Sequence, residues 1–70
     1  MDTVRIEYMI VTENGTVIQN WITCEGSIQN DTQIYFPRAC NAQYRLGMSG
    51  HKTRVRVVNE QTNRILDILQ

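Results

Sequence analysis

The chain has 70 residues, of which 41% are hydrophobic and 20% charged, and its seven Lys and Arg balance its seven Asp and Glu. This length predicts one domain, residues 1–70, with a thin core, and the composition excludes a disordered or low-complexity chain. No apolar run approaches the roughly 18 residues of a membrane-spanning helix, which excludes a membrane-crossing protein.

The first predicted element is a hairpin centred on Asn14-Gly15, a pair typical of a two-residue type I′ turn because both residues tolerate positive φ. Runs rich in β-forming residues, 3–12 and 16–24, flank this turn. The resulting register places Tyr8 across from Trp21. One face of the hairpin, the expected core face, would then carry Val4, Ile6, Tyr8, Ile10, Val17 and Trp21.

The opposite face of the same hairpin is too apolar for a plain solvent face. It carries Met9, Val11, Ile18 and Ile22 among Arg5, Glu7 and Asn20. We therefore expect the rest of the chain, a second subunit or a functional partner to cover part of it.

The middle of the chain is predicted to hold a loop and the only helix. Residues 25–34 are polar and include Gly26, so they are interpreted as a loop, with a short strand possible at 33–36. Pro37 suits the first turn of a helix and Gly47 the residue after its end, which predicts a helix over 37–46. A strand over 43–48 is the alternative. The expected inward stripe of the helix is Phe36, Cys40 and Tyr44, with Ala39 and Gln43 beside it.

The last third is predicted to form a second hairpin. Residues 53–58 alternate as a half-buried strand does, with Val55 and Val57 on one side and Arg54 and Arg56 on the other. Residues 59–63 would form the loop, a type I turn closed by a left-handed Asn63, and 65–69 the returning strand. The alternative is a C-terminal helix capped by Asn59.

These elements predict an α+β fold, in which two antiparallel β-hairpins form a four- or five-stranded sheet with one short helix. A small all-β barrel is the alternative architecture. The chain shows no linker, internal repeat or low-complexity tract.

No catalytic or cofactor-binding pattern emerges, so we expect a protein that is not an enzyme and needs no cofactor. Cys40 beside His51 is the best nucleophile and base available, but no sequence signature joins them. Cys24, Cys40 and His51 lack the spacing of a zinc site, and two cysteines are too few for a disulfide framework. Reduced thiols and the lack of an export signal predict a cytoplasmic protein. Gly47-Met-Ser-Gly50 resembles the backbone-gripping loop of KH domains, but the helices that should frame such a loop are absent.

Charge is segregated along the chain, and this is its most informative functional feature. Residues 1–35 hold five acids and one arginine, whereas residues 36–70 hold six cations and two acids. Cations and aromatic residues are favoured at binding hot spots and at phosphate contacts. The predicted partner-binding residues are Arg38, Tyr44, Arg45, Lys52, Arg54 and Arg56.

The sequence therefore predicts an interaction module that binds a macromolecular partner, most simply a protein, and modulates or inhibits it. Its contact surface would combine the Arg54/Arg56 face with the second face of the first hairpin. A small chain of this kind suits an accessory protein of a phage or mobile element, by association only. The alternatives are a nucleic-acid-binding protein that uses the basic 38–56 segment, and a homo-oligomeric sponge (a dimer or larger) for a phosphorylated small ligand.

Overall fold

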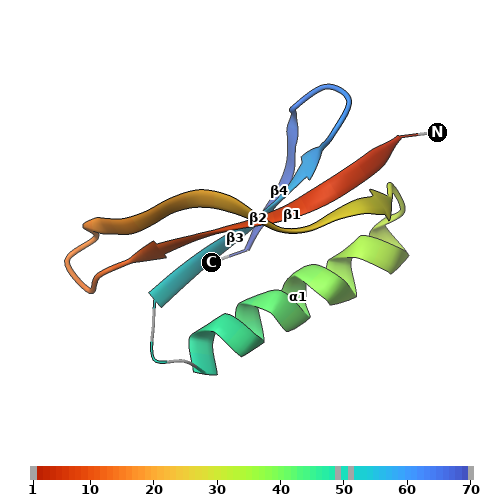
Figure 1. The fold of residues 1–70 in the computed structure, drawn as a ribbon. Coiled ribbons are helices and arrows are strands. Elements are labelled where there is room, and N and C mark those ends of the chain that lie inside the picture. Colours follow the sequence, from red (N-terminus) through yellow and green to blue (C-terminus); the bar gives the residue numbers. More distant parts are fainter. Residues whose placement is uncertain (1, 49, 51, 70) are drawn as a thin grey trace.

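A computed structural model describes residues 2–48, 50 and 52–69, which form one antiparallel sheet of four strands with one helix packed on it (Figure 1). The elements are β1 (Thr3–Val11), β2 (Val17–Gln29), α1 (Thr32–Met48), β3 (Lys52–Asn59) and β4 (Ile65–Leu69). The strands lie in the order β2-β1-β3-β4, and the sheet does not close on itself. The predicted α+β fold is confirmed, and the barrel alternative is wrong.

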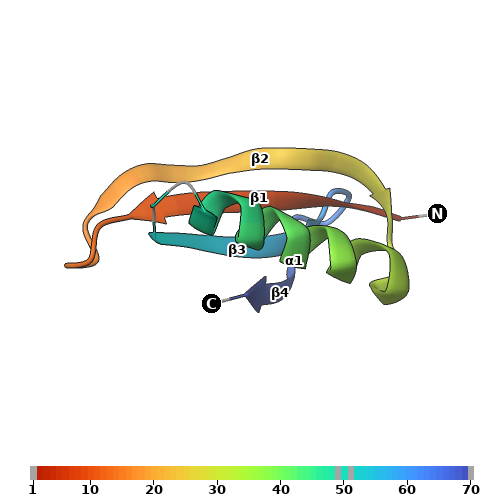
Figure 2. The same ribbon diagram turned by 90° about the horizontal axis from the view of Figure 1, so that it is seen from below.

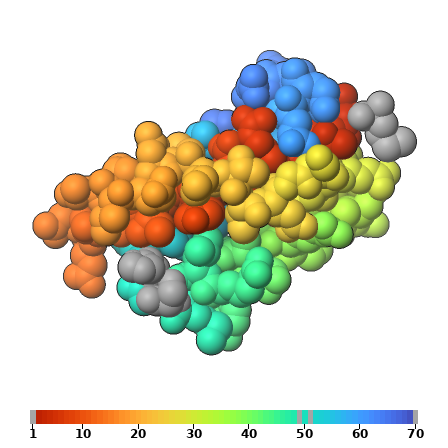
Figure 3. Space-filling view, viewed as in Figure 1, coloured from red at the N-terminus to blue at the C-terminus, as the bar shows by residue number. Residues whose placement is uncertain are grey.

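The molecule has two layers, because α1 covers one face of the sheet and leaves the other without a helix (Figures 1 and 2). Its principal extents are 39 × 21 × 15 Å, so the molecule is elongated. In Figure 3 the tip of the first hairpin projects at one end, and the loop between β3 and β4 rises on the side away from α1.

The first hairpin forms as predicted, but its loop is one residue longer. Thr12 N–H donates to Thr16 O at 2.8 Å, and Gly15 N–H donates to Thr12 O at 2.9 Å. Within this loop only Gly15 has a positive φ, of 86°. These features describe a three-residue loop in which glycine closes a type I turn, in place of the expected two-residue type I′ turn.

The register of β1 against β2 then drifts through bulges, which changes the face of several β2 residues. Ile10 pairs with Gln19 as expected, but Tyr8 pairs with Ile22 and not with Trp21. Each extra residue in a strand moves the following side chains to the opposite face. The predicted core face was therefore wrong for Trp21, which lies on the far side of the sheet from α1, and for Val17, which pairs with Val11 and is 50% exposed. The core consists of Val4, Ile6, Ile28, Tyr35, Ala39, Ala42, Val55, Val57 and Leu69.

Residues 25–34, predicted as a loop, are instead the end of β2 and the start of α1. Ile28 is buried opposite Val4, and Ser27 absorbs a bulge with a φ of 56°. The polar composition misled the prediction because β2 is an edge strand that exposes most of its side chains. Asp31 caps the helix by accepting a hydrogen bond from Gln33 N–H at 2.9 Å.

Helix α1 begins five residues before the predicted start at Pro37 and extends two residues beyond the predicted end. Pro37 lies inside the helix, where its missing N–H costs the bond to the carbonyl of Gln33. The packing of the helix on the sheet offsets this loss. Both strand predictions in this region, 33–36 and 43–48, were wrong.

The inward stripe of α1 is displaced by one residue from the predicted one. Tyr35, Ala39 and Ala42 are buried at helical spacing, whereas Phe36, Cys40 and Tyr44 are exposed. Of the predicted stripe, Ala39 is fully buried and Gln43 is half-buried. Two alanines at the contact allow the helix to lie close to the sheet.

The second hairpin matches the prediction, and the C-terminal helix alternative is wrong. Val55 and Val57 are buried under α1, while Arg54 and Arg56 alternate to the other face. Asn63 N–H donates to Asn59 O at 2.8 Å, and Asn63 has the expected left-handed φ of 61°.

Candidate binding face

The face of the sheet away from α1, here called the open face, presents a mixed set of charged, aromatic and aliphatic side chains. The pairing of β1 with β3 is regular throughout, so alternation along these strands assigns each residue to a face. Pairing with β3 assigns the β4 residues, and contact with Arg56 assigns Trp21. The open face carries Arg5, Glu7, Met9, Trp21, Lys52, Arg54, Arg56, Ile65 and Ile68.

A carboxylate held between two guanidinium groups forms the centre of the open face. Glu7 accepts a hydrogen bond from Arg5 Nε at 2.7 Å on one oxygen and from Arg56 Nε at 2.6 Å on the other. The Arg56 guanidinium carbon also lies 4.0 Å from the centroid of the Trp21 ring. The three strands β1, β2 and β3 are thus joined by one chain of polar and cation–π contacts.

This arrangement determines the charge state of Glu7, whose residue is only 7% exposed. Burial alone would raise its pKa, but the hydrogen bonds and positive charges of Arg5 and Arg56 outweigh burial and hold the pKa below its ordinary value. Glu7 is therefore ionised at neutral pH and neutralises about one of the two cations beside it.

The open face nevertheless has an excess of positive charge. Alternation on β1 and β3 places four cations there, Arg5, Lys52, Arg54 and Arg56. The carboxylates on this side are Glu7 and, just beyond the end of β3, Glu60, which accepts a hydrogen bond from Thr3 Oγ1 at 2.7 Å. In the described part of the chain no ion pair involves Arg54 or Lys52, and both are exposed. These two side chains are available to an outside partner.

The six predicted partner-binding residues do not share one face. Lys52, Arg54 and Arg56 lie on the open face, whereas Arg38, Tyr44 and Arg45 lie on α1, in the other layer. Arg38 pairs with Glu25 of β2, and the Tyr44 side chain is among the most exposed, at 68%. The structure therefore divides the predicted site into two surfaces.

Arg5, Glu7 and Trp21 of the open face are not among the six predicted partner-binding residues, although the predicted contact surface did include the face of the first hairpin that carries Arg5 and Glu7. Arg5 and Glu7 alternate with buried aliphatic residues on β1, a signal that was present in the sequence. Trp21 could not be found in this way, because its face depends on bulges in β2 that no local pattern announces.

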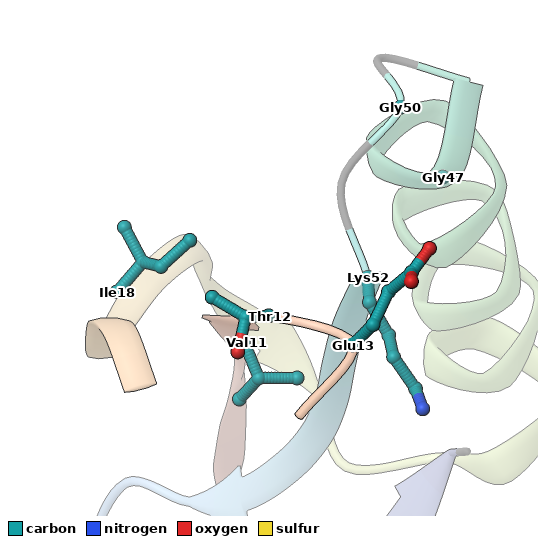
Figure 4. Close-up of a pocket in the computed structure, with 7 residues that line it drawn as sticks. All are labelled: Val11, Thr12, Glu13, Ile18, Gly47, Gly50 and Lys52. Carbon is teal, nitrogen blue, oxygen red and sulfur yellow. The ribbon is translucent and has the colours of Figure 1, made fainter. Parts of the chain in front are cut away.

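A cavity of about 550 Å³ lies at one end of the molecule, where the first hairpin, the end of α1 and the start of β3 meet. Figure 4 shows the residues that line it. Its lining includes Glu13 from the hairpin loop and Lys52 from β3. Two glycines, Gly47 and Gly50, leave much of its wall without side chains. The cavity therefore lies beside Lys52, at that residue's end of the open face.

The residues considered for catalysis or metal binding do not gather into a site within the part of the chain that is described. Cys24 and Cys40 are exposed free thiols, and the predicted base, His51, lies outside the described residues. Over residues 2–48, 50 and 52–69, no cluster of three or more potential metal ligands is found. No helix among those residues is both long and apolar enough to span a bilayer.

No protein-family model, curated protein or solved structure is significantly similar to this chain.

Proposed function

We propose that this protein is a non-enzymatic interaction module that binds an acidic surface of a protein partner through the open face and so modulates that partner. The observation that carries the proposal is a sheet face without a helix over it, with the Trp21–Arg56 stack at its centre and an excess of cations around it.

The charges of the open face support an acidic partner. Arg54 and Lys52 project from β3 without an internal carboxylate in the described structure, so carboxylates of a partner would be their natural counterparts. The Arg5–Glu7–Arg56 cluster is already ordered by its internal hydrogen bonds. Side chains fixed in advance lose less entropy on binding.

Apolar area on the same face supports a protein in preference to a nucleic acid. Ile65 and Ile68 of β4 are 49% and 50% exposed beside the charged centre. Trp and Arg at the centre of a patch with aliphatic surroundings is the composition of a protein-binding hot spot. The basic 38–56 segment, by contrast, is split between the two layers, so a nucleic acid strand would have to cross the sheet edge to contact all of it.

The test is affinity capture from the source cells with three tagged forms of the protein: wild type, Arg54→Glu and Arg45→Glu. Arg54 lies on the open face and Arg45 on α1, so the two variants make the same charge change in different layers. We expect one protein to be captured by wild type and Arg45→Glu and lost with Arg54→Glu. The purified pair should then show a Kd raised about tenfold or more by Arg54→Glu, as for a well-placed charge pair.

Three outcomes would contradict the proposal. Equal capture by all three forms would show that the open face is not the contact surface. Capture that disappears after nuclease treatment, with oligonucleotide binding that weakens steeply as salt rises, would favour the nucleic-acid alternative. A homo-oligomer whose melting temperature rises with a nucleotide would favour the ligand sponge.

A further inference from the structure

A second candidate surface lies on the helix side of the molecule, between α1 and the edge strand β2. Side chains of β1, β2 and α1 line a cavity of about 390 Å³ there, which we call the edge groove. The short side chain of Ala42 leaves room between the helix and the strand. The groove is lined by Tyr8, Thr23, Cys24, Ala42, Arg45 and Leu46.

The groove combines an apolar floor with a positive rim. Tyr8, Ala42 and Leu46 supply aromatic and aliphatic surface and are buried or half-buried. Arg45 is exposed, and it forms no ion pair within the described structure. An occupant that places an aliphatic side chain on the floor and a carboxylate near Arg45 would match both features.

The wall of the groove is itself an edge strand. β2 is the outermost strand of the sheet on this side, so backbone groups on its outer side are open to a further strand. Nearer the hairpin tip the strand is capped internally, since Trp21 N–H donates to the Asn20 side chain at 2.9 Å. In the described structure no side chain caps the backbone of residues 22–24, of which Thr23 and Cys24 line the groove.

We propose that the edge groove binds an extended peptide segment of a protein, which adds as a strand to residues 22–24 of β2. Its backbone would pair with the strand edge, one aliphatic side chain would enter the groove, and an acidic residue close to it would pair with Arg45. This site is separate from the open face and does not depend on the function proposed for that face.

Charge argues against a second copy of the chain as the occupant. Two copies paired edge to edge about a twofold axis through residues 22–24 would each bring an Arg45 to the shared junction. Like charges there would repel each other, whereas an acidic peptide would be attracted.

The experiment selects from a random heptapeptide display library on the wild-type protein and, in parallel, on Arg45→Glu, with Arg54→Glu as the matched control. We expect peptides with an acidic residue within two positions of an aliphatic one to be enriched on wild type and Arg54→Glu. A synthetic copy of an enriched peptide should bind Arg45→Glu at least about fivefold more weakly. In NMR spectra it should shift the amides of residues 22–24 and 42–46.

Two methylated copies of the peptide test the strand pairing, one with its odd-numbered backbone nitrogens methylated and one with its even-numbered nitrogens methylated. Methylation keeps the side chains but removes the hydrogen-bond donors at those positions. At least one of the two copies should bind much more weakly than the unmethylated peptide. Full binding of both methylated copies, enrichment that does not depend on Arg45, shifts confined to the open face, or no enrichment at all would each overturn the proposal. So would a dimer of the free protein joined through β2. This test is independent of the capture experiment on the open face, because the edge groove and the open face are separate surfaces. A failure of partner capture would therefore not change the peptide-binding results expected at the edge groove.

Discussion

Glu7 shows how one buried carboxylate can organise a surface. Its two oxygens each accept one arginine Nε–H donor, and this fixes Arg56 in the position from which it stacks on Trp21. Removing the negative charge would leave two guanidinium groups close together without the carboxylate that offsets their mutual repulsion. The order of the open face therefore depends on a residue that is itself hardly exposed.

The substitution Glu7→Gln should lower the free energy of unfolding by about 1–3 kcal/mol, because the amide keeps one acceptor oxygen but turns an NH2 donor toward the other arginine, and because it removes the negative charge between two cations in a mostly buried site. Urea unfolding followed by circular dichroism measures this change. The matched control is Glu13→Gln in the exposed hairpin loop, which should change the stability by less than about 0.5 kcal/mol. Equal effects of the two substitutions would contradict the role given to Glu7.

The lowered pKa of Glu7 also predicts how stability depends on pH. A carboxylate whose pKa is lower in the folded state binds its proton more weakly there than in the unfolded chain. Its contribution is complete above roughly pH 4.3, the ordinary pKa of glutamate, and is lost as the pH falls toward the folded value. Unfolding free energies measured from pH 7 downward should therefore fall more steeply for the wild type than for Glu7→Gln. Parallel profiles would contradict this assignment.

At the scale of the element, α1 was placed correctly in the chain but misjudged in length and rotation. Its inward positions carry alanines, which give a weak hydrophobic pattern, while larger residues such as Phe36 and Tyr44 face outward. A sequence pattern weights the large apolar residues and so selects the wrong stripe. The N-terminal boundary was hidden because Pro37, usually found in the first turn, lies further inside.

Two tyrosines of this helix give a matched test of the rotation. Tyr35 is 7% exposed and packs in the core, whereas Tyr44 is 68% exposed. Tyr35→Ala should lower the unfolding free energy by about 3 kcal/mol, as for other large-to-small changes in a core, and Tyr44→Ala by less than about 0.5 kcal/mol. Thermal and urea unfolding of both variants provide the measurement. A larger loss of stability with Tyr44→Ala than with Tyr35→Ala would instead favour the inward stripe predicted from the sequence, Phe36, Cys40 and Tyr44.

For β strands, the sequence predicted the second hairpin well and the first one only in part. Residues 53–69 obey local rules, since strict alternation and a left-handed asparagine fix both strands and loop. β2 breaks the alternation with bulges and follows a longer loop than Asn14-Gly15 suggests. The face of Trp21, and with it the centre of the candidate site, depended on this nonlocal geometry.

At the scale of the whole molecule, the topology places β1 and β3 side by side at the centre of the sheet, with β2 and β4 outside. Charge segregation along the sequence did not translate into a single basic surface. The α1 crossover carries Arg38 and Arg45 to one layer while β3 carries Arg54 and Arg56 to the other. Composition predicts how many cations exist, but only topology decides which of them meet.

Amide hydrogen exchange should distinguish the central strands of the sheet from the tip of the first hairpin. The central amides of β1 and β3 are paired on both sides of each strand and lie over the core, so they should exchange most slowly. Amides at the tip of the first hairpin, residues 13–20, should exchange faster than those. NMR exchange rates measured at neutral pH test this order, and uniform protection across the four strands would contradict it.

The central position of β1 also has a consequence during synthesis. On the ribosome β1 emerges well before β3, from which it is separated by β2 and the whole of α1. Until β3 has been translated, the first hairpin has an unpaired inner edge, and α1 lacks the strand on which it mainly packs. Co-translational folding of this protein therefore has to wait until the last third of the chain has left the exit tunnel.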